Sequence, residues 1–109
     1  MSGSFQLKKS GEQFMFNLKA TNGQVILTSE RYASRQAALD GIESVRKNAV
    51  HDDRFDRLLA KDGSPYFNLK AGNGQTIGRS EMYKSTASRD AGVESVKKNG
   101  PTALLKDET

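Results

Sequence analysis

Apolar and polar residues alternate over short stretches of this 109-residue chain, the pattern of half-buried β-strands. The clearest stretch is Phe14–Ala20, whose core side would carry Phe14, Phe16, Leu18 and Ala20. Asn22-Gly23 follows it, and Asn-Gly between two alternating runs favours a tight hairpin turn. Together with Phe5–Lys9 before it and Val25–Thr28 after it, this stretch predicts a three-stranded antiparallel meander.

The pattern then changes to a helical period. Ser34 stands where an N-cap is expected, and about fourteen residues with helical spacing follow it. The apolar face of this helix would carry Ala38, Ile42 and Val45. On its outer face, Glu43 and Lys47 are spaced as an i,i+4 ion pair.

The second half of the chain repeats the first. A shift of 51 positions places residues 16–48 on residues 67–99 without gaps, and 19 of these 33 positions are identical. The upstream segments match with one extra residue in the second copy. The second helix would begin after the N-cap Ser85, bury Val93 and Val96, carry the pair Glu94–Lys98 and end before Pro101.

Short strands are also expected after each helix. Arg54–Leu59 follows the first helix and can equally open the second unit, and Thr102–Leu105 follows the second helix. The predicted fold is therefore α+β: two tandem β3-α-β units share one antiparallel sheet, with both helices packed on one face. The units span residues 1–51 and 52–109 of one compact domain, and 106–109 are expected to be a disordered tail.

Gly41 and Gly92 occupy the same position inside the two predicted helices. Glycine within a helix is less favourable than alanine by about 1 kcal/mol. Its presence in both copies predicts that the helix backbone comes close to the sheet there. A ligand approaching at this turn is the alternative, but the neighbouring Ile42 and Val93 point to the core.

The repeated motif resembles that of the YegP-like family of small bacterial tandem-repeat proteins. The residues that carry it are "FNLKA-NGQ" from Phe16 and Phe67, the two "SE-Y" segments at 29–32 and 80–83, and "SV--N" before Asn48 and Asn99. This resemblance covers almost the whole chain. It implies two β3-α-β units in one sheet with their C-terminal strands exchanged, and it implies no activity, cofactor or catalytic residue.

Composition narrows the possible functions. The net charge of +4 and the pI of about 9.5 permit an anionic partner without requiring one. Cysteine is absent, which excludes disulfides, thiol nucleophiles and thiolate metal sites. No apolar run is long enough for a spanning helix, and the first residues lack the apolar stretch of a secretory signal, so a soluble cytoplasmic protein is expected.

Candidate chemistry is sparse. His51, the only histidine, lies in a polar connector beside Asp52 and Asp53, and adjacent residues cannot all converge on a metal. The segment from Gly72 to Gly78 reads G-x-G-x-x-x-G, which fails the dinucleotide-binding spacing, and it joins two predicted strands instead of leading into a helix. The sequence therefore predicts no cofactor, no metal and no enzyme.

Two repeated glutamates, Glu30 and Glu81, are a pair of carboxylates related by the duplication. They could form an acid–base pair across a pseudo-twofold axis. The alternative favoured by their position is structural: each would cap or salt-bridge the turn before its helix, with Tyr32 and Tyr83 packed at the helix entrance.

The sheet face opposite the helices is the candidate binding face. Alternation along the strands places six polar or amphipathic residues there: Met15, Asn17, Lys19, Tyr66, Asn68 and Lys70. If Ile26 and Ile77 lie in the core, Val25 and Leu27 also lie on this face. One interpretation is a plain solvated surface; its apolar members instead suggest a protein contact, either a partner or a homodimer. Weak nucleic-acid binding through its lysines and tyrosine is the alternative function.

Overall fold

The protein folds into one sheet covered on one face by two helices. The structure is a computed structural model that describes residues 3–109. The first unit supplies β1 (Ser4–Ser10), β2 (Gln13–Lys19), β3 (Val25–Ser29) and α1 (Arg35–Asn48). These three strands form the predicted meander, since β2 pairs antiparallel with both β1 and β3.

The second unit repeats this order and adds one strand. It consists of a 3-10 turn, η1 (Asp52–Arg54), then four strands and a helix: β4 (Phe55–Leu59), β5 (Pro65–Lys70), β6 (Thr76–Arg79), α2 (Thr86–Asn99) and β7 (Leu104–Asp107). The segment after α1 therefore opens the second unit as β4, paired with β5. The division of the chain at residue 51 stays a prediction.

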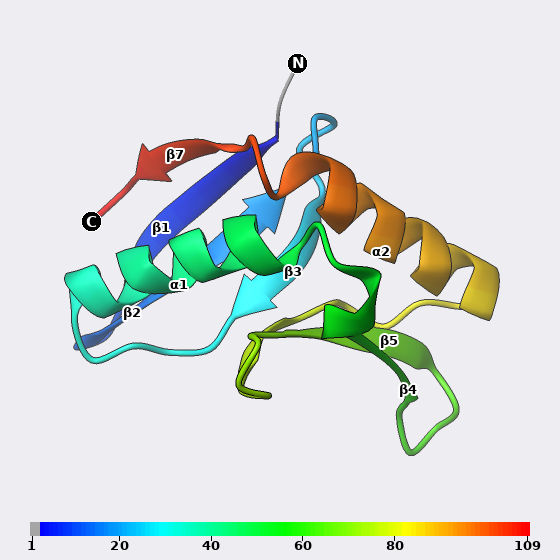
Figure 1. Ribbon diagram of the computed structural model, residues 1–109. Helices are drawn as coiled ribbons and strands as arrows, with labels where there is room; N and C mark the ends of the chain where they lie inside the picture. The colour runs from blue at the N-terminus through cyan, green and yellow to red at the C-terminus, as the bar shows by residue number, and fades with distance from the viewer. Residues whose placement is uncertain (1–2) are drawn as a thin grey trace.

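All seven strands belong to one sheet, in the order β4-β5-β6-β3-β2-β1-β7. The two units meet where β3 pairs with β6, through Thr28 opposite Arg79 and Ser29 opposite Gly78. Thr28 and Arg79 are the same position of the repeat, so the pseudo-twofold axis passes between them. Both helices lie on the same face of the sheet, as predicted (Figure 1).

The two helices begin as the sequence predicts. Ser34 Oγ accepts a hydrogen bond from the Ala37 N–H, and Ser85 Oγ accepts one from the Ser88 N–H. The predicted i,i+4 ion pairs are replaced by i,i+3 pairs. Arg46 donates to Glu43 at 3.0 Å, and Lys97 donates to Glu94 at 3.3 Å.

The core lies between the helices and the sheet. Phe16 and Phe67, one from each unit, are fully buried and each meets a second phenylalanine ring edge-on. On the other side, Tyr32 stacks on Phe16 with ring centroids 6.3 Å apart. The buried apolar side chains include all those predicted for the helices: Ala38, Ile42, Val45, Val93 and Val96.

Gly41 and Gly92 explain how the tyrosines fit. A Cβ on Gly41 would lie 2.8 Å from Tyr32 Cζ and 3.1 Å from Phe16 Cε2. Gly92 has the same relation to Tyr83 and Phe67. The prediction of close approach is therefore correct, and the tyrosine ring beside the phenylalanine of the sheet is what fills the space at this turn of the helix.

A β-bulge in the third strand of each unit changes which residues reach the core. Leu18 pairs with Leu27 whereas Lys19 pairs with Val25, so Ile26 is an extra residue in β3. As a result Ile26 and Leu27 are both buried, and the prediction that Leu27 lies on the open face is wrong. The alternation from Val25 assumed a regular strand, and the bulge interrupts it.

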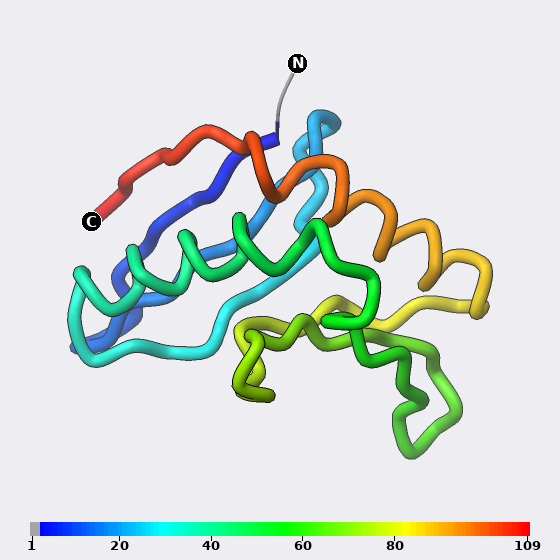
Figure 2. The backbone as a smooth tube through the Cα atoms, viewed as in Figure 1, coloured from blue at the N-terminus to red at the C-terminus, as the bar shows by residue number. Residues whose placement is uncertain are grey.

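The last strand makes the sheet mixed, because β7 runs parallel to β1 along its outer edge (Figure 2). Strand exchange thus occurs in one direction: the second unit supplies β7 to the first, and no strand of the described chain occupies the corresponding place beside β4. The Glu108 N–H also donates to the Leu7 carbonyl at 2.8 Å. These contacts are at odds with the expectation of a disordered tail at 106–109.

Acid is expected to loosen β7. Hydrogen bonds from the Thr109 side chain and from Arg35 lower the pKa of Asp107 from its ordinary 3.8 to about 2. A carboxyl with a lowered folded-state pKa stabilises the fold above its unfolded pKa, and this contribution is lost as the pH falls from 3.8 towards 2. Amide-exchange protection at Glu108 should therefore drop over this range in the wild type and not in Asp107→Asn. Equal pH profiles for the two proteins would contradict this role of Asp107.

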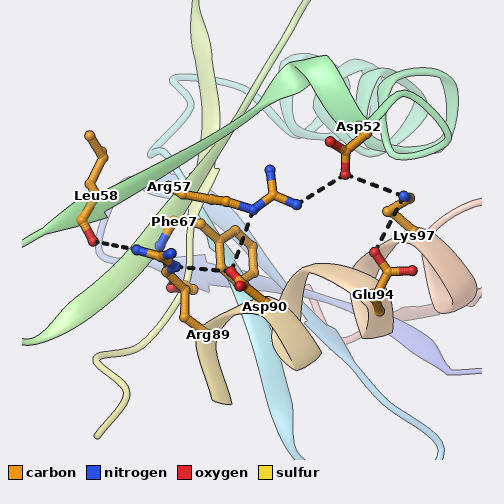
Figure 3. A network of polar contacts seen from close by, with 9 residues as sticks. Asp52, Arg57, Leu58, Phe67, Arg89, Asp90, Glu94 and Lys97 are labelled. Carbon is orange, nitrogen blue, oxygen red and sulfur yellow. Dashed lines mark hydrogen bonds and ion pairs between the residues drawn. The ribbon is translucent and has the colours of Figure 1, made fainter. Parts of the chain in front are cut away.

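The opposite edge of the sheet, β4, is protected by charge. Arg57 corresponds to Leu7 of the first unit, which is fully buried where β7 covers that edge. Arg57 pairs instead with Asp52 at 3.0 Å and Asp90 at 3.4 Å, within a chain of ion pairs that continues to Lys97 (Figure 3). An inward-pointing charge on an edge strand discourages further strand pairing. Arg57 is thus expected to keep the free edge of β4 from pairing with a further strand.

Candidate interaction face

The sheet face away from the helices carries a continuous row of polar side chains. Strand pairing places one residue of each strand in this row, which we call the polar row: Lys106, Gln6, Asn17, Thr28, Arg79, Asn68 and Asp56. The row crosses the whole sheet and is centred on the pseudo-twofold axis. It includes both asparagines that the sequence singled out.

The two asparagines hold the central members of the polar row. Asn17 Oδ1 accepts a hydrogen bond from Thr28 Oγ1 at 2.9 Å, and Asn68 Oδ1 accepts one from Arg79 Nε at 3.3 Å. The guanidinium of Arg79 also lies over the Tyr66 ring, 5.6 Å from its centroid. The centre of the row is therefore held by contacts between its own side chains and with Tyr66.

The six predicted face residues do lie together on this surface, but they are not equally available. Lys70 forms an ion pair with Asp56 at 2.6 Å, and Arg79 covers one face of Tyr66. Met15 sits beside Lys8 across the β1–β2 pair, and Lys19 sits beside Ser4. Asn17 and Asn68 are half-buried within the polar row.

Sequence reasoning missed several cationic members of the face. Arg79 reaches this side because the bulge at Ile77 shifts the alternation of β6, and Lys106 reaches it because β7 joins the sheet beside β1. Lys8 could have been found, since it alternates with the buried Phe5 and Leu7. None of the ion pairs within residues 3–109 involves Lys8, Lys19, Lys106 or Arg79.

Two shallow hollows, each of about 380 Å³, open on the face. One lies at the β7 end, where Lys19 and Lys106 share its lining with Gln6 and Glu108. The other lies where β3 pairs with β6, and Thr28 and Arg79 share its lining with the two glutamates Glu30 and Glu81. Both hollows are sized for side chains of a partner more than for a large cofactor.

Glu30 and Glu81 do not make the predicted contacts with their turns. Both are exposed and take part in no ion pair among the described residues. The preceding serines fill the structural role instead. Buried Ser29 Oγ accepts from the Phe16 N–H at 2.9 Å and donates to the Glu30 carbonyl, and Ser80 repeats both bonds with Phe67 and Glu81.

The two tyrosines of this segment pack against the core, but their rings lie beside Gly41 and Gly92 in the middle of the helices and not at the helix entrances as predicted. Burial, and secondarily the nearby Glu30, raise the pKa of Tyr32 above its ordinary value of 10.0. Tyr83 has a raised pKa for the same reasons, with Glu81 as the neighbouring charge. Both phenols therefore stay protonated at neutral pH, which suits packing more than proton abstraction.

The other sequence candidates take structural places. His51 is exposed and occupies the N-cap position of η1 without a side-chain capping hydrogen bond, and Asn73-Gly74 forms the β5–β6 hairpin turn with Gly74 at φ 88°. Across residues 3–109 no cluster of His, Cys, Asp and Glu is arranged to hold a metal ion. Within the same residues, neither helix has the length and apolar character needed to cross a membrane. The cytoplasmic location stays a prediction.

Comparison with known proteins supports the repeat and the fold. The family described as "Domain of unknown function (DUF1508)" matches the chain twice, over residues 10–56 and 60–107. A UPF0339 protein of Bordetella pertussis is 64% identical over 100% of this chain and 98% of its own length. The UPF0339 protein YegP of Escherichia coli is 50% identical, with both chains covered completely.

Two solved structures are similar to this one throughout. The solution NMR structure of a UPF0339 protein from Shewanella oneidensis has a TM-score of 0.92 at 54% identity, covering 98% of this chain and 92% of that one. The solution NMR structure of a protein of unknown function, yegP from E. coli, has a TM-score of 0.94 at 50% identity, covering 100% and 95%. The family resemblance and the α+β repeat fold are thereby confirmed.

Proposed function

We propose that this protein, which belongs to the DUF1508 family, is a non-enzymatic binding module whose open sheet face docks on an acidic surface of a partner protein. The polar row is the observation that carries the proposal. It presents donors that are already oriented by Asn17 and Asn68, so little side-chain freedom is lost on docking. Its unpaired cations favour a partner of opposite charge.

The distribution of charge supports an acidic partner. Lys19 and Lys106 line one hollow, and Arg79 lies at the other. Two acidic residues on the face already have partners, since Asp56 pairs with Lys70 and Glu108 accepts from the Gln6 amide at 2.8 Å. Glu30 and Glu81 line the Arg79 hollow, so the Lys19–Lys106 hollow is the one that favours an acidic partner more strongly. The net charge of +4 for the whole chain adds a long-range attraction for an acidic partner.

A protein partner is favoured over nucleic acid by the state of the aromatic residue. Single-stranded nucleic acids bind sheet faces by stacking bases on exposed rings. Tyr66 is the one tyrosine on this face, and the Arg79 guanidinium already lies over its ring. A base that stacks on this face of the ring would have to displace Arg79, whereas a carboxylate on a partner can pair with Arg79 in its present position.

Charge reversal on the face tests the proposal. Proteins that the immobilised wild type captures from a cell lysate should not be captured by the double variant Lys19→Glu/Arg79→Glu. The affinity of this variant for a glutamate-rich decapeptide should be at least about tenfold lower than that of the wild type. The matched control is Lys47→Glu/Lys98→Glu, which makes the same change of charge on the helices. This control should still capture the lysate proteins and bind the decapeptide as the wild type does.

Three results would count against the proposal. Equal loss with the control variant would show a general charge effect instead of a docking face. Tighter binding of a ten-nucleotide single strand than of the decapeptide at physiological salt, with chemical-shift changes at Tyr66, would favour the nucleic-acid alternative. Concentration-dependent dimerisation abolished by Lys19→Glu/Arg79→Glu would identify a second copy as the occupant.

A further inference from the structure

The outer edge of β7 is open to a further strand. Among residues 3–109 no strand pairs with it, and it forms the rim of the sheet beyond β1 (Figure 1). The Leu104 and Glu108 N–H groups donate to carbonyls on the β1 side. Backbone groups alternate in direction along a strand, so the N–H and C=O groups of Leu105 and Asp107 point outward. β7 therefore offers a row of donors and acceptors that no other strand uses.

The two edges of the sheet differ in how they are protected. On β4 the charged Arg57 stands at the middle of the strand and holds ion pairs with Asp52 and Asp90. On β7 the ion pair of Asp107 with Arg35 lies at the last residue of the strand. A charge that points inward at mid-strand discourages pairing. β7 is thus the edge better suited to receive a strand.

Two neighbouring leucines of β7 are exposed. Leu104 is 64% exposed on the open face, and Leu105 is 43% exposed on the helix side, where it pairs with the buried Phe5. In adjacent strands, directly opposite residues have Cβ atoms about 4.5–5.5 Å apart. Side chains of a strand added to β7 would therefore stand beside both leucines at once.

Lys106 gives this edge its charge. It lies on the open face beside Leu104 and takes part in no ion pair among residues 3–109. It shares a hollow of about 380 Å³ with Lys19, and the acid of that hollow, Glu108, already accepts from an amide of the protein. Opposite charges across adjacent strands stabilise a sheet. An acidic side chain opposite Lys106 would be favoured for this reason.

A second copy of β7 fits this edge less well. Pairing with any further strand has to use the outward groups of Leu105 and Asp107. In the antiparallel registers centred on Lys106 or on Asp107, that residue faces its own copy, and like charges directly opposite are destabilising. The register centred on Leu105 places Lys106 opposite Leu104 and gives it no acidic partner. The edge therefore favours a foreign strand over its own copy.

We propose that β7 receives an extended segment of the acidic partner protein as a further, antiparallel strand of the sheet. This inference rests on the proposed function, because it names the part of the partner that binds. The segment carries an acidic residue opposite Lys106 and apolar residues opposite Leu104 and Leu105. Hydrogen bonds to the outward backbone groups supply the pairing, and these side chains supply the selectivity.

The experiment is amide hydrogen exchange on the full chain with the end-blocked peptide Ser-Thr-Glu-Val-Val-Thr-Ser. Its glutamate would stand opposite Lys106 and its valines opposite Leu105 and Leu104. At saturation, exchange of the Leu105 and Asp107 N–H groups should slow by at least about tenfold, because both become hydrogen-bonded. The Lys106 and Glu108 N–H groups already face β1, and their exchange should change by less than about twofold.

Methylated peptides test the backbone pairing. An N-methyl group on the valine opposite Leu105 removes a hydrogen bond to β7, so it should weaken binding by at least about tenfold. The matched control carries the N-methyl group on the glutamate, whose N–H points away from β7. This peptide should bind within about threefold of the parent peptide.

A charge exchange tests the side-chain pairing. Lys106→Glu should weaken binding of the parent peptide by at least about fivefold, and it should bind the peptide with lysine in place of the glutamate better than the wild type does. The control Lys61→Glu makes the same change in the exposed β4–β5 turn. It should leave the affinities for both peptides unchanged.

The inference is overturned if the parent peptide does not bind, or if it binds without slowing exchange at Leu105 and Asp107. Equal weakening by the two methyl groups would overturn it as well, because backbone pairing would then play no part. Protection of Leu105 that grows with protein concentration in the absence of peptide would identify a second copy as the occupant and reject a foreign segment.

The proposed docking face and the added strand can fail separately. Peptide-induced shifts at Asn17 and Asn68 without protection of Leu105 would leave the open face as a binding surface and reject only the added strand. Protection of Leu105, together with capture of the same lysate proteins by Lys19→Glu/Arg79→Glu, would reject the docking face and support the added strand.

Discussion

Leu27→Ala is expected to lower the free energy of unfolding by about 2–5 kcal/mol, the range for truncating a fully buried leucine. The cavity would lie at the pseudo-twofold axis. There Leu27 and its repeat counterpart Gly78 compete for one place: a Cβ on Gly78 would lie 3.0 Å from Leu27 Cγ and 2.9 Å from the Thr28 carbonyl. One leucine thus fills a space that two copies cannot share.

Chemical denaturation monitored by circular dichroism measures this loss. Leu59→Ala is the matched control, since the same atoms are removed from a side chain that is 62% exposed on the β4 edge. It should change the free energy of unfolding by less than about 0.5 kcal/mol. Similar losses for the two variants would show that the seam between the units is not closely packed around Leu27.

Gly41→Ala is expected to destabilise the protein by about 1–3 kcal/mol, although alanine is the better helix former. The added Cβ would meet Tyr32 Oη at 2.5 Å and Cζ at 2.8 Å, and the Tyr32 ring is held by stacking on Phe16. In a Tyr32→Ala background the two shortest contacts are gone, and the one with Phe16 Cε2 at 3.1 Å remains. The same Gly41→Ala change should then stabilise the helix by up to about 1 kcal/mol.

A double-mutant cycle tests this change of sign. Gly92→Ala and Tyr83→Ala provide an independent repeat, because Gly92 faces Tyr83 and Phe67 in the same way. If Gly41→Ala destabilises equally with and without Tyr32, the glycine is needed for some property of the helix backbone and not to make room for the tyrosine ring.

Local patterns were sufficient for most of the elements. Alternation from Phe14 and the Asn-Gly turn predicted the first hairpin, and Ser34 and Ser85 marked the starts of helices of the expected length. These signals are short-range, because side-chain direction and capping depend on residues within a few positions. The 51-residue shift then implied that the strands and the helix of the first unit recur in the second.

The candidate face was predicted less completely than the fold. Asn17, Lys19, Asn68 and Lys70 lie where strand alternation placed them. The ion pair of Lys70 with Asp56 and the position of Arg79 over Tyr66 were not predictable, because each joins residues on different strands. Strand order and register decide such contacts, and alternation within one strand carries no information about either.

By itself, then, the sequence determined the duplicated unit, its strands and helices, most of its apolar core positions and the absence of cysteine chemistry. The tertiary structure decided how two similar units become different. It paired β7 with β1, left β4 as an edge strand that carries the charged Arg57, and placed Leu27 at the axis where its counterpart is Gly78. The reason is steric: positions near a pseudo-twofold axis, or beside an edge that only one strand can cover, cannot be occupied twice.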